Sequence, residues 1–317
     1  MTRKYIIGSR GSELALWQAN FVKNHIESLF PKSTFEIKII KTTGDQLVDT
    51  ALSKIGDKGL FTRQIETELL NGEIDFAVHS LKDLQTVQPY GLVIGAVCER
   101  EVPNDVFISR SYASIDKLPE AARVATGSLR RKSQLLNFRP DLEVVEIRGN
   151  VPTRLKKFKE SDLDGLILAY AGLCRLGLEK EVSQLIPFST MLPAVGQGAV
   201  AVEVRADDEQ STGLAVRLDD GPTRICITAE RAFLRRLEGG CQVPIGAIAT
   251  LENDRVYLDG MVGSLDGSVI FREHIDGAAA EAENVGIRLA EKLIEKGAEK
   301  LLAETRAQIG TSAETVM

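Results

Sequence analysis

The sequence has few of the residues that build metal centres, disulfide frameworks or membrane spans. Its 317 residues include four cysteines, none in a C-x-x-C pair, and three histidines without metal-ligand spacing. Its apolar runs are too short to cross a bilayer, and no export signal is visible. We therefore expect no metal, no membrane, and reduced thiols in the cytoplasm.

A broad basic surface and the common nucleotide motifs are lacking as well. Lys and Arg number 39 against 45 Asp and Glu, and this net charge of −6 argues against a nucleic-acid partner. Gly196 and Gly198 form a G-x-G that leads into a strand, whereas a dinucleotide fingerprint leads into a helix. Residues 121–160 nevertheless hold ten Lys or Arg against four Asp or Glu. This local excess fits a site for a carboxylated small molecule better than one for a nucleic acid.

What is present is an alternation of strand and helix patterns over the first two thirds of the chain. Apolar runs such as residues 74–78 and 166–169 predict buried strands, and residues with helical spacing lie between several of them. The alternation predicts an α/β fold with doubly wound, mostly parallel sheets.

The last hundred residues follow a different order. Three strand patterns come in a row, after one predicted helix and before a longer one. This order predicts a small α+β module that begins near residue 220. The predicted segments are helix 223–238, strands 245–250, 256–262 and 269–274, and helix 278–304.

Three predicted strands lead into helices through the same kind of turn. Each turn combines Gly with Ser or Asn and has an arginine at or near the helix start. A helix N-terminus presents free N–H groups, and arginine can bind a carboxylate with two hydrogen bonds. Any one turn can equally be a simple helix cap, but three together predict a polyanionic ligand. The turns are residues 8–12, 127–131 and 148–152.

Individual residues carry further hypotheses. Asp83 follows the strand at 74–78 and is either a general acid or base or the cap of a turn. His79 is interpreted as a structural hydrogen-bonding residue. Cys241 lies between a glycine pair and a proline, which is typical of an exposed turn, and a buried thiol is the alternative. The other cysteines lie in apolar runs and are predicted to be core residues: Cys98, Cys174 and Cys226.

Seven segments carry the motifs of one family in that family's order. They are Gly8-Ser9-Arg10-Gly11-Ser12, Lys58-Gly59-Leu60-Phe61, His79-Ser80-Leu81-Lys82-Asp83, Gly127-Ser128-Leu129-Arg130-Arg131, Arg148-Gly149-Asn150-Val151, Gly196-Gln197-Gly198-Ala199 and Gly239-Gly240-Cys241-Gln242-Val243-Pro244. Through them the chain resembles the hydroxymethylbilane synthase family, also called porphobilinogen deaminase, over almost its whole length.

The resemblance implies two lobes similar to periplasmic binding proteins and a small α+β third domain. Domain 1 would comprise residues 1–98 with 196–216, domain 2 residues 103–192, and domain 3 residues 220–317. The implied enzyme is a monomeric transferase of porphyrin and haem biosynthesis. It condenses porphobilinogen head to tail, releases ammonia and forms the linear tetrapyrrole hydroxymethylbilane. It uses a dipyrromethane cofactor held through a thioether, and Cys241 matches the attachment cysteine.

The resemblance also implies roles for single residues. Asp83 matches the catalytic aspartate, which assists departure of the amine, stabilises the azafulvene cation and helps to remove the ring proton. Lys58 matches a loop that folds over the site. The residues that match cofactor-binding positions are Cys241, Lys82, Asp83, Ser128, Arg130, Arg131 and Arg154. The residues that match substrate-binding positions are Arg10, Ser12, Arg148, Arg154 and Arg175.

The chain departs from the family pattern two residues after Asp83, where Gln85 stands in place of the usual proline and leaves the turn less rigid. Two rival functions are a non-catalytic two-lobed receptor for a carboxylated small molecule and a cysteine-dependent hydrolase. A receptor does not need the third domain with Cys241. A hydrolase would need a histidine partner for the thiol, and none of the three histidines is a convincing candidate.

Overall fold

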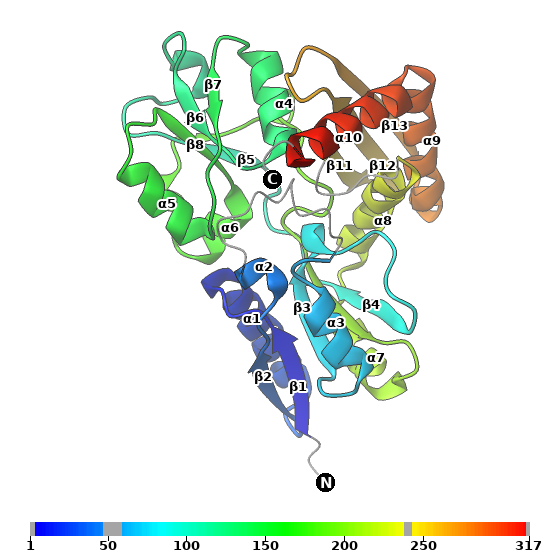
Figure 1. Cartoon of the computed structure of the whole chain (residues 1–317). Helices are drawn as coiled ribbons and strands as arrows, with labels where there is room; N and C mark the ends of the chain where they lie inside the picture. The colour runs from blue at the N-terminus through cyan, green and yellow to red at the C-terminus, as the bar shows by residue number, and fades with distance from the viewer. Residues whose placement is uncertain (1–3, 47–58, 238–242, 315–317) are drawn as a thin grey trace. The chain divides into compact units, whose positions relative to one another are not determined.

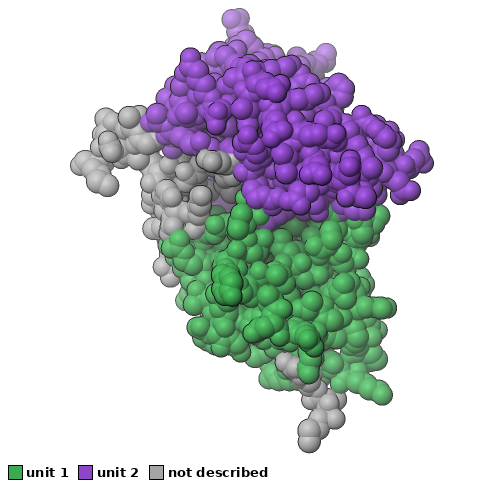
Figure 2. Space-filling model, turned by 90° about the vertical axis from the view of Figure 1, so that its right-hand side faces the viewer, with its two compact units in different colours: residues 1–48, 57–101, 198–224 green, residues 49–56, 102–197, 225–317 purple. Residues whose placement is uncertain are grey.

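The computed structural model describes residues 4–46, 59–237 and 243–314, and the side chains of residues 4–44, 59–237 and 243–309 (Figure 1). The chain divides into two units, which Figure 2 shows in different colours. It leaves unit 1 after Glu101 and returns to it at Gly198. Unit 1 comprises Met1–Val48, Asp57–Glu101 and Gly198–Arg224, and unit 2 comprises Asp49–Gly56, Val102–Gln197 and Ile225–Met317.

A five-stranded sheet with the order β2-β1-β3-β10-β4 forms the centre of unit 1. Strands β2, β1 and β3 are parallel, and β10 runs antiparallel to both β3 and β4. The prediction of a mostly parallel sheet is therefore confirmed, and the exception is the strand of the returning segment. The strands are β1 (Lys4–Ser9), β2 (Thr34–Ile39), β3 (Phe76–Ser80), β4 (Leu92–Val97) and β10 (Val200–Arg205).

Helices cover both faces of this sheet (Figure 1). Helix α1 (Glu13–Leu29) buries Ala19, Val22 and Ile26 against one face, and these residues are spaced three and four positions apart. Helix α3 (Arg63–Leu70) buries Ile65 and Leu69 against the other face. The remaining helical segments of unit 1 are α2 (Thr43–Gln46), η2 (Leu81–Asp83), α7 (Glu209–Ala215), η5 (Val216–Leu218) and the start of α8.

The first sheet of unit 2 has the same number of strands, in the order β7-β6-β8-β5-β9. Strands β7, β6 and β8 are parallel, and β5 is antiparallel to both of its neighbours. The strands are β5 (Asp105–Ile108), β6 (Arg123–Ala125), β7 (Glu143–Val145), β8 (Gly165–Ala169) and β9 (Gln184–Leu185). The helical segments are η3 (Ile115–Lys117), α4 (Leu129–Phe138), α5 (Val151–Lys159), α6 (Tyr170–Arg175) and η4 (Glu179–Glu181).

A second sheet of unit 2, β11-β12-β13, is antiparallel and has helices packed against it, which confirms the predicted α+β module. The prediction of one helix over 278–304 is wrong. Two helices occupy this region, because Gly297 adopts a φ of +105° that ends the first of them. The elements are α8 (Gly221–Arg236), β11 (Ile245–Glu252), β12 (Arg255–Gly263), β13 (Ile270–Ala278), η6 (Ala279–Glu281), α9 (Ala282–Glu295) and α10 (Ala298–Glu314).

Within the described ranges, Cys98, Cys174 and Cys226 form no disulfide bond with one another. Cys98 and Cys226 are buried in apolar cores, as predicted. Cys174 is only half-buried, because it lies in the last turn of the short helix α6. Among the helices that the structure describes, none has the length and apolar character needed to cross a membrane.

Phe233 of α8 is fully buried in the core of the α+β module, among residues of β11, β12 and α9. Phe233→Ala is expected to lower the free energy of unfolding by about 3–5 kcal/mol, because the truncation leaves a cavity in packed surroundings. Phe138→Ala is the control, since Phe138 is 43% exposed and should lose less than about 1 kcal/mol. Chemical denaturation measures both, and equal losses would contradict the core assignment.

Candidate active site

In unit 1, the candidate residues follow the carboxyl ends of two neighbouring parallel strands. Arg10 and Ser12 follow β1, and Lys82 and Asp83 follow β3 in the turn η2. The carboxyl ends of parallel neighbours meet at one edge of a sheet, where open α/β sheets bind ligands. The structure therefore brings these four residues to the same edge. The Arg10 guanidinium carbon lies 4.3 Å from the ring centroid of Phe61.

Asp83 is half-buried in a turn that backbone hydrogen bonds hold. Leu84 N donates to Leu81 O at 3.1 Å, and Leu81 N donates to Ala199 O at 3.0 Å. The turn forms with Gln85 in place of the family's proline. Towards the described residues, the Asp83 carboxylate makes no hydrogen bond or ion pair. Nothing in that part of the chain supports a capping role, and the carboxylate is available for other chemistry.

In unit 2, the candidate residues again follow parallel strands that lie side by side. Strands β7, β6 and β8 are adjacent in the sheet, and each leads into a helix at the same edge. The sheet therefore gathers guanidinium groups that are far apart in the sequence. Ser128, Arg130 and Arg131 follow β6, Arg148 and Arg154 follow β7, and Arg175 follows β8.

The three predicted strand-to-helix turns all contain helix caps. Ser12 accepts a hydrogen bond from Ala15 N at 3.3 Å, and Ser128 accepts one from Arg131 N at 3.4 Å. Asn150 accepts one from Thr153 N at 2.9 Å. Each bond satisfies one of the free N–H groups at a helix start. Capping is therefore confirmed at all three turns, while anion binding there stays a prediction.

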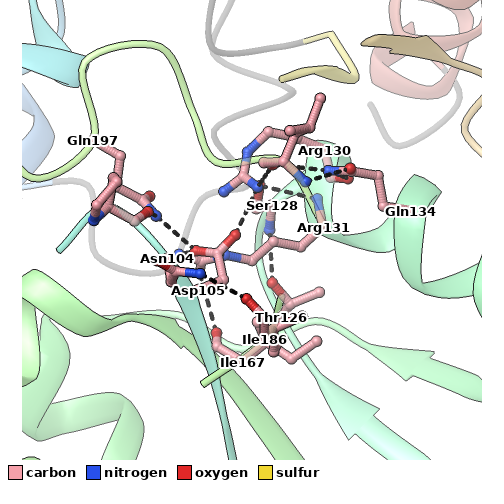
Figure 3. Close-up of polar contacts among 12 residues, drawn as sticks. Asn104, Asp105, Thr126, Ser128, Arg130, Arg131, Gln134, Ile167, Ile186 and Gln197 are labelled. Atoms are coloured by element: carbon pink, nitrogen blue, oxygen red, sulfur yellow. Dashed lines mark hydrogen bonds and ion pairs between the residues drawn. The ribbon is translucent and has the colours of Figure 1, made fainter. Parts of the chain in front are cut away.

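Asp105, at the start of β5, lies between the two arginines of α4 (Figure 3). Its Oδ2 accepts from Arg130 Nη1 at 2.6 Å, and its Oδ1 accepts from Arg131 Nη2 at 2.8 Å and Nε at 3.1 Å. Asp105 is 0% exposed and each arginine is 5% exposed. The three side chains form a buried ionic cluster, which we call the Asp105 cluster.

Further polar groups complete the Asp105 cluster (Figure 3). Gln197 Nε2 donates to Asp105 Oδ1 at 2.9 Å, and the Ile167 carbonyl accepts from Arg131 Nη1 at 3.1 Å. The Leu192 carbonyl accepts from Arg130 Nη1 at 2.6 Å. Gln134 in turn binds both the carbonyl and the N–H of Leu192. These bonds fix both guanidinium planes against the sheet.

The Asp105 cluster carries a net positive charge, because two guanidinium groups share one carboxylate. Burial alone would raise the pKa of Asp105, but Arg130 and Arg131 outweigh it and hold the pKa far below its ordinary value. Burial lowers the pKa of Arg130. Among the described residues, Nε and Nη2 of Arg130 have no hydrogen-bond acceptor. A carboxylate from a ligand would balance the remaining charge.

The other predicted arginines lie nearer to solvent. The half-buried Arg148 pairs with the exposed Glu146, with Nη2 and Oε1 2.8 Å apart, and a pair with one partner in solvent contributes little to stability. Arg154 and Arg175 are half-buried at the same edge of the sheet. Lys58 and Cys241 lie outside the described residues.

Three residues of this site were missed in the sequence: Asp105, Gln134 and Gln197. Asp105 directly precedes the apolar run Val106-Phe107-Ile108, and a carboxylate that is buried with such a run needs a cationic partner. That position was a usable signal for a buried ion pair. Gln134 and Gln197 are polar residues in ordinary contexts, and no sequence signal distinguishes them.

Comparisons with known proteins agree with one another. The family model described as "Porphobilinogen deaminase, dipyromethane cofactor binding domain" matches residues 5–213, and that of the C-terminal domain matches residues 224–295. The chain is 52% identical to the porphobilinogen deaminase of Pelotomaculum thermopropionicum over 308 residues, covering 97% of this chain and 99% of the relative. It is also 52% identical to the porphobilinogen deaminase of Carboxydothermus hydrogenoformans over 306 residues, which cover 96% of this chain and 98% of the relative. Among solved structures, this chain is similar to the methionine-binding protein MetQ, with a TM-score of 0.43 and 14% sequence identity. The match covers 68% of this chain and 89% of the MetQ chain.

The fold and the site define an α/β enzyme that gathers arginines, and an aspartate with no described partner, at the carboxyl ends of parallel strands. Within that class, the chain belongs to the porphobilinogen deaminase family. It is a transferase of tetrapyrrole synthesis with a dipyrromethane cofactor. This membership decides against the receptor and the cysteine hydrolase.

Asp105→Asn is expected to destabilise the protein by about 3–5 kcal/mol, because it leaves two buried guanidinium groups without a counter-charge. The depressed pKa of Asp105 stabilises the fold above its ordinary value of 3.8, and this contribution is lost as the pH falls below that value. The difference between the parent and the variant should therefore shrink in acid. Asp141→Asn is the control, since Asp141 pairs with Arg139 near solvent. Denaturant titrations at several pH values measure both, and a variant as stable as the parent at pH 7 would refute the role of Asp105.

Proposed function

We propose that this enzyme condenses porphobilinogen head to tail, with loss of ammonia, on arginines that bind the acetate and propionate of each ring. The observation that carries the proposal is the Asp105 cluster, where two buried guanidinium groups share one carboxylate. Arginine binds carboxylates with two parallel hydrogen bonds, which suits a ligand with two carboxylates per ring. Each added ring brings two more carboxylates, so one cationic group does not suffice.

The residues of unit 2 fit a dipyrromethane. The group carries two rings with four carboxylates, and the open donors of Arg130 match one of them. When bound, it supplies the nucleophilic pyrrole carbon to which substrate is added. We assign its attachment to the Cys241 thiol, through a thioether. The side chains of unit 2 that we assign to it are those of Ser128, Arg130, Arg131 and Arg154, and the family resemblance adds Lys82 and Asp83 of unit 1.

Asp83 is the catalytic residue of the proposal. The carbon–nitrogen bond of the substrate's protonated aminomethyl group breaks, and the nitrogen leaves with the electron pair as neutral ammonia. The Asp83 carboxylate stabilises the positive charge left on the substrate and helps to remove the proton from the ring carbon after the new carbon–carbon bond has formed. Its half-buried position without a partner among the described residues supports this role.

The remaining residues bind and enclose the substrate. Arg10, Arg148 and Arg175 bind the carboxylates of incoming porphobilinogen, and Arg154 serves both substrate and cofactor. Ser12 assists with its hydroxyl group. Lys58 belongs to a loop that folds over the site.

We further propose a three-domain division and a monomer in the cytoplasm. Unit 2 contains two sheets with separate apolar cores, which supports domains at 103–192 and 220–317. Unit 1 corresponds to the domain at 1–98 with 196–216. The described cysteines form no disulfide bond with one another, which suits a reducing compartment. The net charge of −6 supports an enzyme without a nucleic-acid partner.

Cys241→Ser is expected to have the mass of the bare chain and to form almost no product, because a hydroxyl group does not form the thioether. Intact mass spectrometry and Ehrlich's colour reaction measure the loaded cofactor. Cys226→Ser is the control and should stay loaded, since Cys226 is buried in the core. An adduct that persists in Cys241→Ser, or one found on Cys98, Cys174 or Cys226, would refute the assignment.

Asp83→Asn is expected to fold like the parent, while kcat falls at least about a hundredfold, because the amide carries neither the negative charge nor the base. Asp83→Glu keeps both and should lose less. Thermal unfolding and steady-state kinetics with porphobilinogen measure the two effects. Near-normal turnover by a well-folded Asp83→Asn protein would return the residue to a structural role.

A further inference from the structure

Three buried titratable side chains of unit 1 take no part in the mechanism above. Glu66, His79 and Glu203 are 4%, 5% and 0% exposed. His79 Nε2 and Glu203 Oε2 lie 3.3 Å apart. We call these three side chains the acid cluster.

The sheet register and helix α3 bring the acid cluster together. His79 of β3 lies opposite Ala201 of β10, and Glu203 lies opposite Ala77. The two side chains are therefore diagonal neighbours on one face of the sheet. Helix α3 packs on β3 and β10 and adds Glu66.

The polar atoms of the acid cluster are buried but have few hydrogen-bond partners. Among the described residues, Glu66 Oε1, His79 Nε2 and both carboxylate oxygens of Glu203 have no hydrogen-bond partner. A buried carboxylate without a partner is costly when ionised, so it takes up a proton instead. Burial is the largest influence on the pKa of Glu66 and raises it. Thr62 and His79 lower this pKa and Glu203 raises it, and the net direction is upward. Glu66 therefore holds its proton at pH values where an exposed glutamate has lost it.

Cations near the acid cluster do not neutralise it. Arg63, one turn earlier on α3, lowers the pKa of Glu66, but burial outweighs this effect. Lys38 of β2 and Arg205 of β10 are bound to other carboxylates. Strand β4 has no charged residue, and Lys4 of β1 is exposed and bound to Glu36. The partners of Lys38 are Glu68 and Glu73, and those of Arg205 are Asp75 and Asp208.

The acid cluster lies directly before the turn that carries Asp83. The pairing of β3 with β10 ends at Ser80 and Val200, and the next hydrogen bond, from Leu81 N to Ala199 O, begins the turn η2. His79 is the residue before Ser80. Because Glu66 lies on α3 and Glu203 on β10, a repulsion between them would act on the packing of α3 against β10, next to the strand β3 that leads into η2.

We propose that Glu66, His79 and Glu203 are positioning residues for Asp83: the acid cluster keeps β3, β10 and α3 packed and thereby fixes the turn η2. The proposal rests on the catalytic role proposed for Asp83. None of the three side chains needs to touch substrate.

The first test is stability against pH, which does not depend on activity. Because the pKa of Glu66 is raised, the folded state keeps a proton that the unfolded chain loses near the ordinary value of 4.5. The parent therefore loses stability as the pH rises from about that value to the raised pKa. Glu66→Gln cannot ionise, so its stability relative to the parent should increase over this interval. The exposed Glu36→Gln is the control and should show a flat difference.

The second test is the kcat and KM of the holoenzymes for porphobilinogen across the same pH range. The kcat of Glu66→Gln relative to the parent should rise about threefold to tenfold as the parent's Glu66 ionises, with KM unchanged, since the turn and not the binding site is disturbed. If Glu66→Gln folds poorly, Glu203→Gln is the second variant: it removes the other carboxyl group of the acid cluster and should change kcat in the same direction.

Two results would overturn the proposal. A flat stability difference for Glu66→Gln would show that the acid cluster holds no extra proton. The second result is a stability difference that rises with pH while the ratio of the kcat of Glu66→Gln to that of the parent stays constant. It would show that the cluster is structural and does not position Asp83. The catalytic role of Asp83 is tested separately. If the Asp83→Asn enzyme is active, that role is wrong, but the result of the Glu66→Gln stability test does not change.

Discussion

The burial of one carboxylate between two guanidinium groups organises the cationic site of unit 2. The strand that carries Asp105 and the helix that carries Arg130 and Arg131 are about 25 residues apart in the sequence. Each of these charged groups would pay a large desolvation cost if it were buried alone. Paired, they fix the start of α4 against β5 and β8. The Asp105 cluster has two positive charges and one negative charge. It therefore supports the fold and also leaves one positive charge for an anionic ligand to balance.

The two units hold buried charge of opposite kinds. The Asp105 cluster has an excess of cations, whereas the acid cluster of unit 1 combines two carboxylates with one imidazole. An excess of cations can be balanced by a ligand that brings carboxylates, while an excess of carboxylates is balanced by protons. This difference is the physical reason to assign ligand binding to the first cluster and positioning to the second.

Local sequence determined much of this fold and part of its site. Period-two and helical patterns predicted the strands and most helices, and Gly, Ser and Asn predicted the turns whose caps are Ser12, Ser128 and Asn150. These features depend on residues within a few positions of one another. The order of strands and helices also predicted which sheet edge the candidate residues follow in each unit, because parallel strands place their carboxyl ends together. These residues are Arg10 and Asp83 in unit 1 and Arg130 and Arg148 in unit 2.

Only the tertiary structure decided which buried charges meet. Asp105 pairs with residues on α4, and His79 meets Glu203 through a register between strands more than a hundred residues apart. The end of α9 at Gly297 likewise became visible only in the structure, because the residues on both sides have helical propensity. Local patterns carry no information about long-range register, and the protonation of a buried group depends on all the neighbours that the fold brings to it.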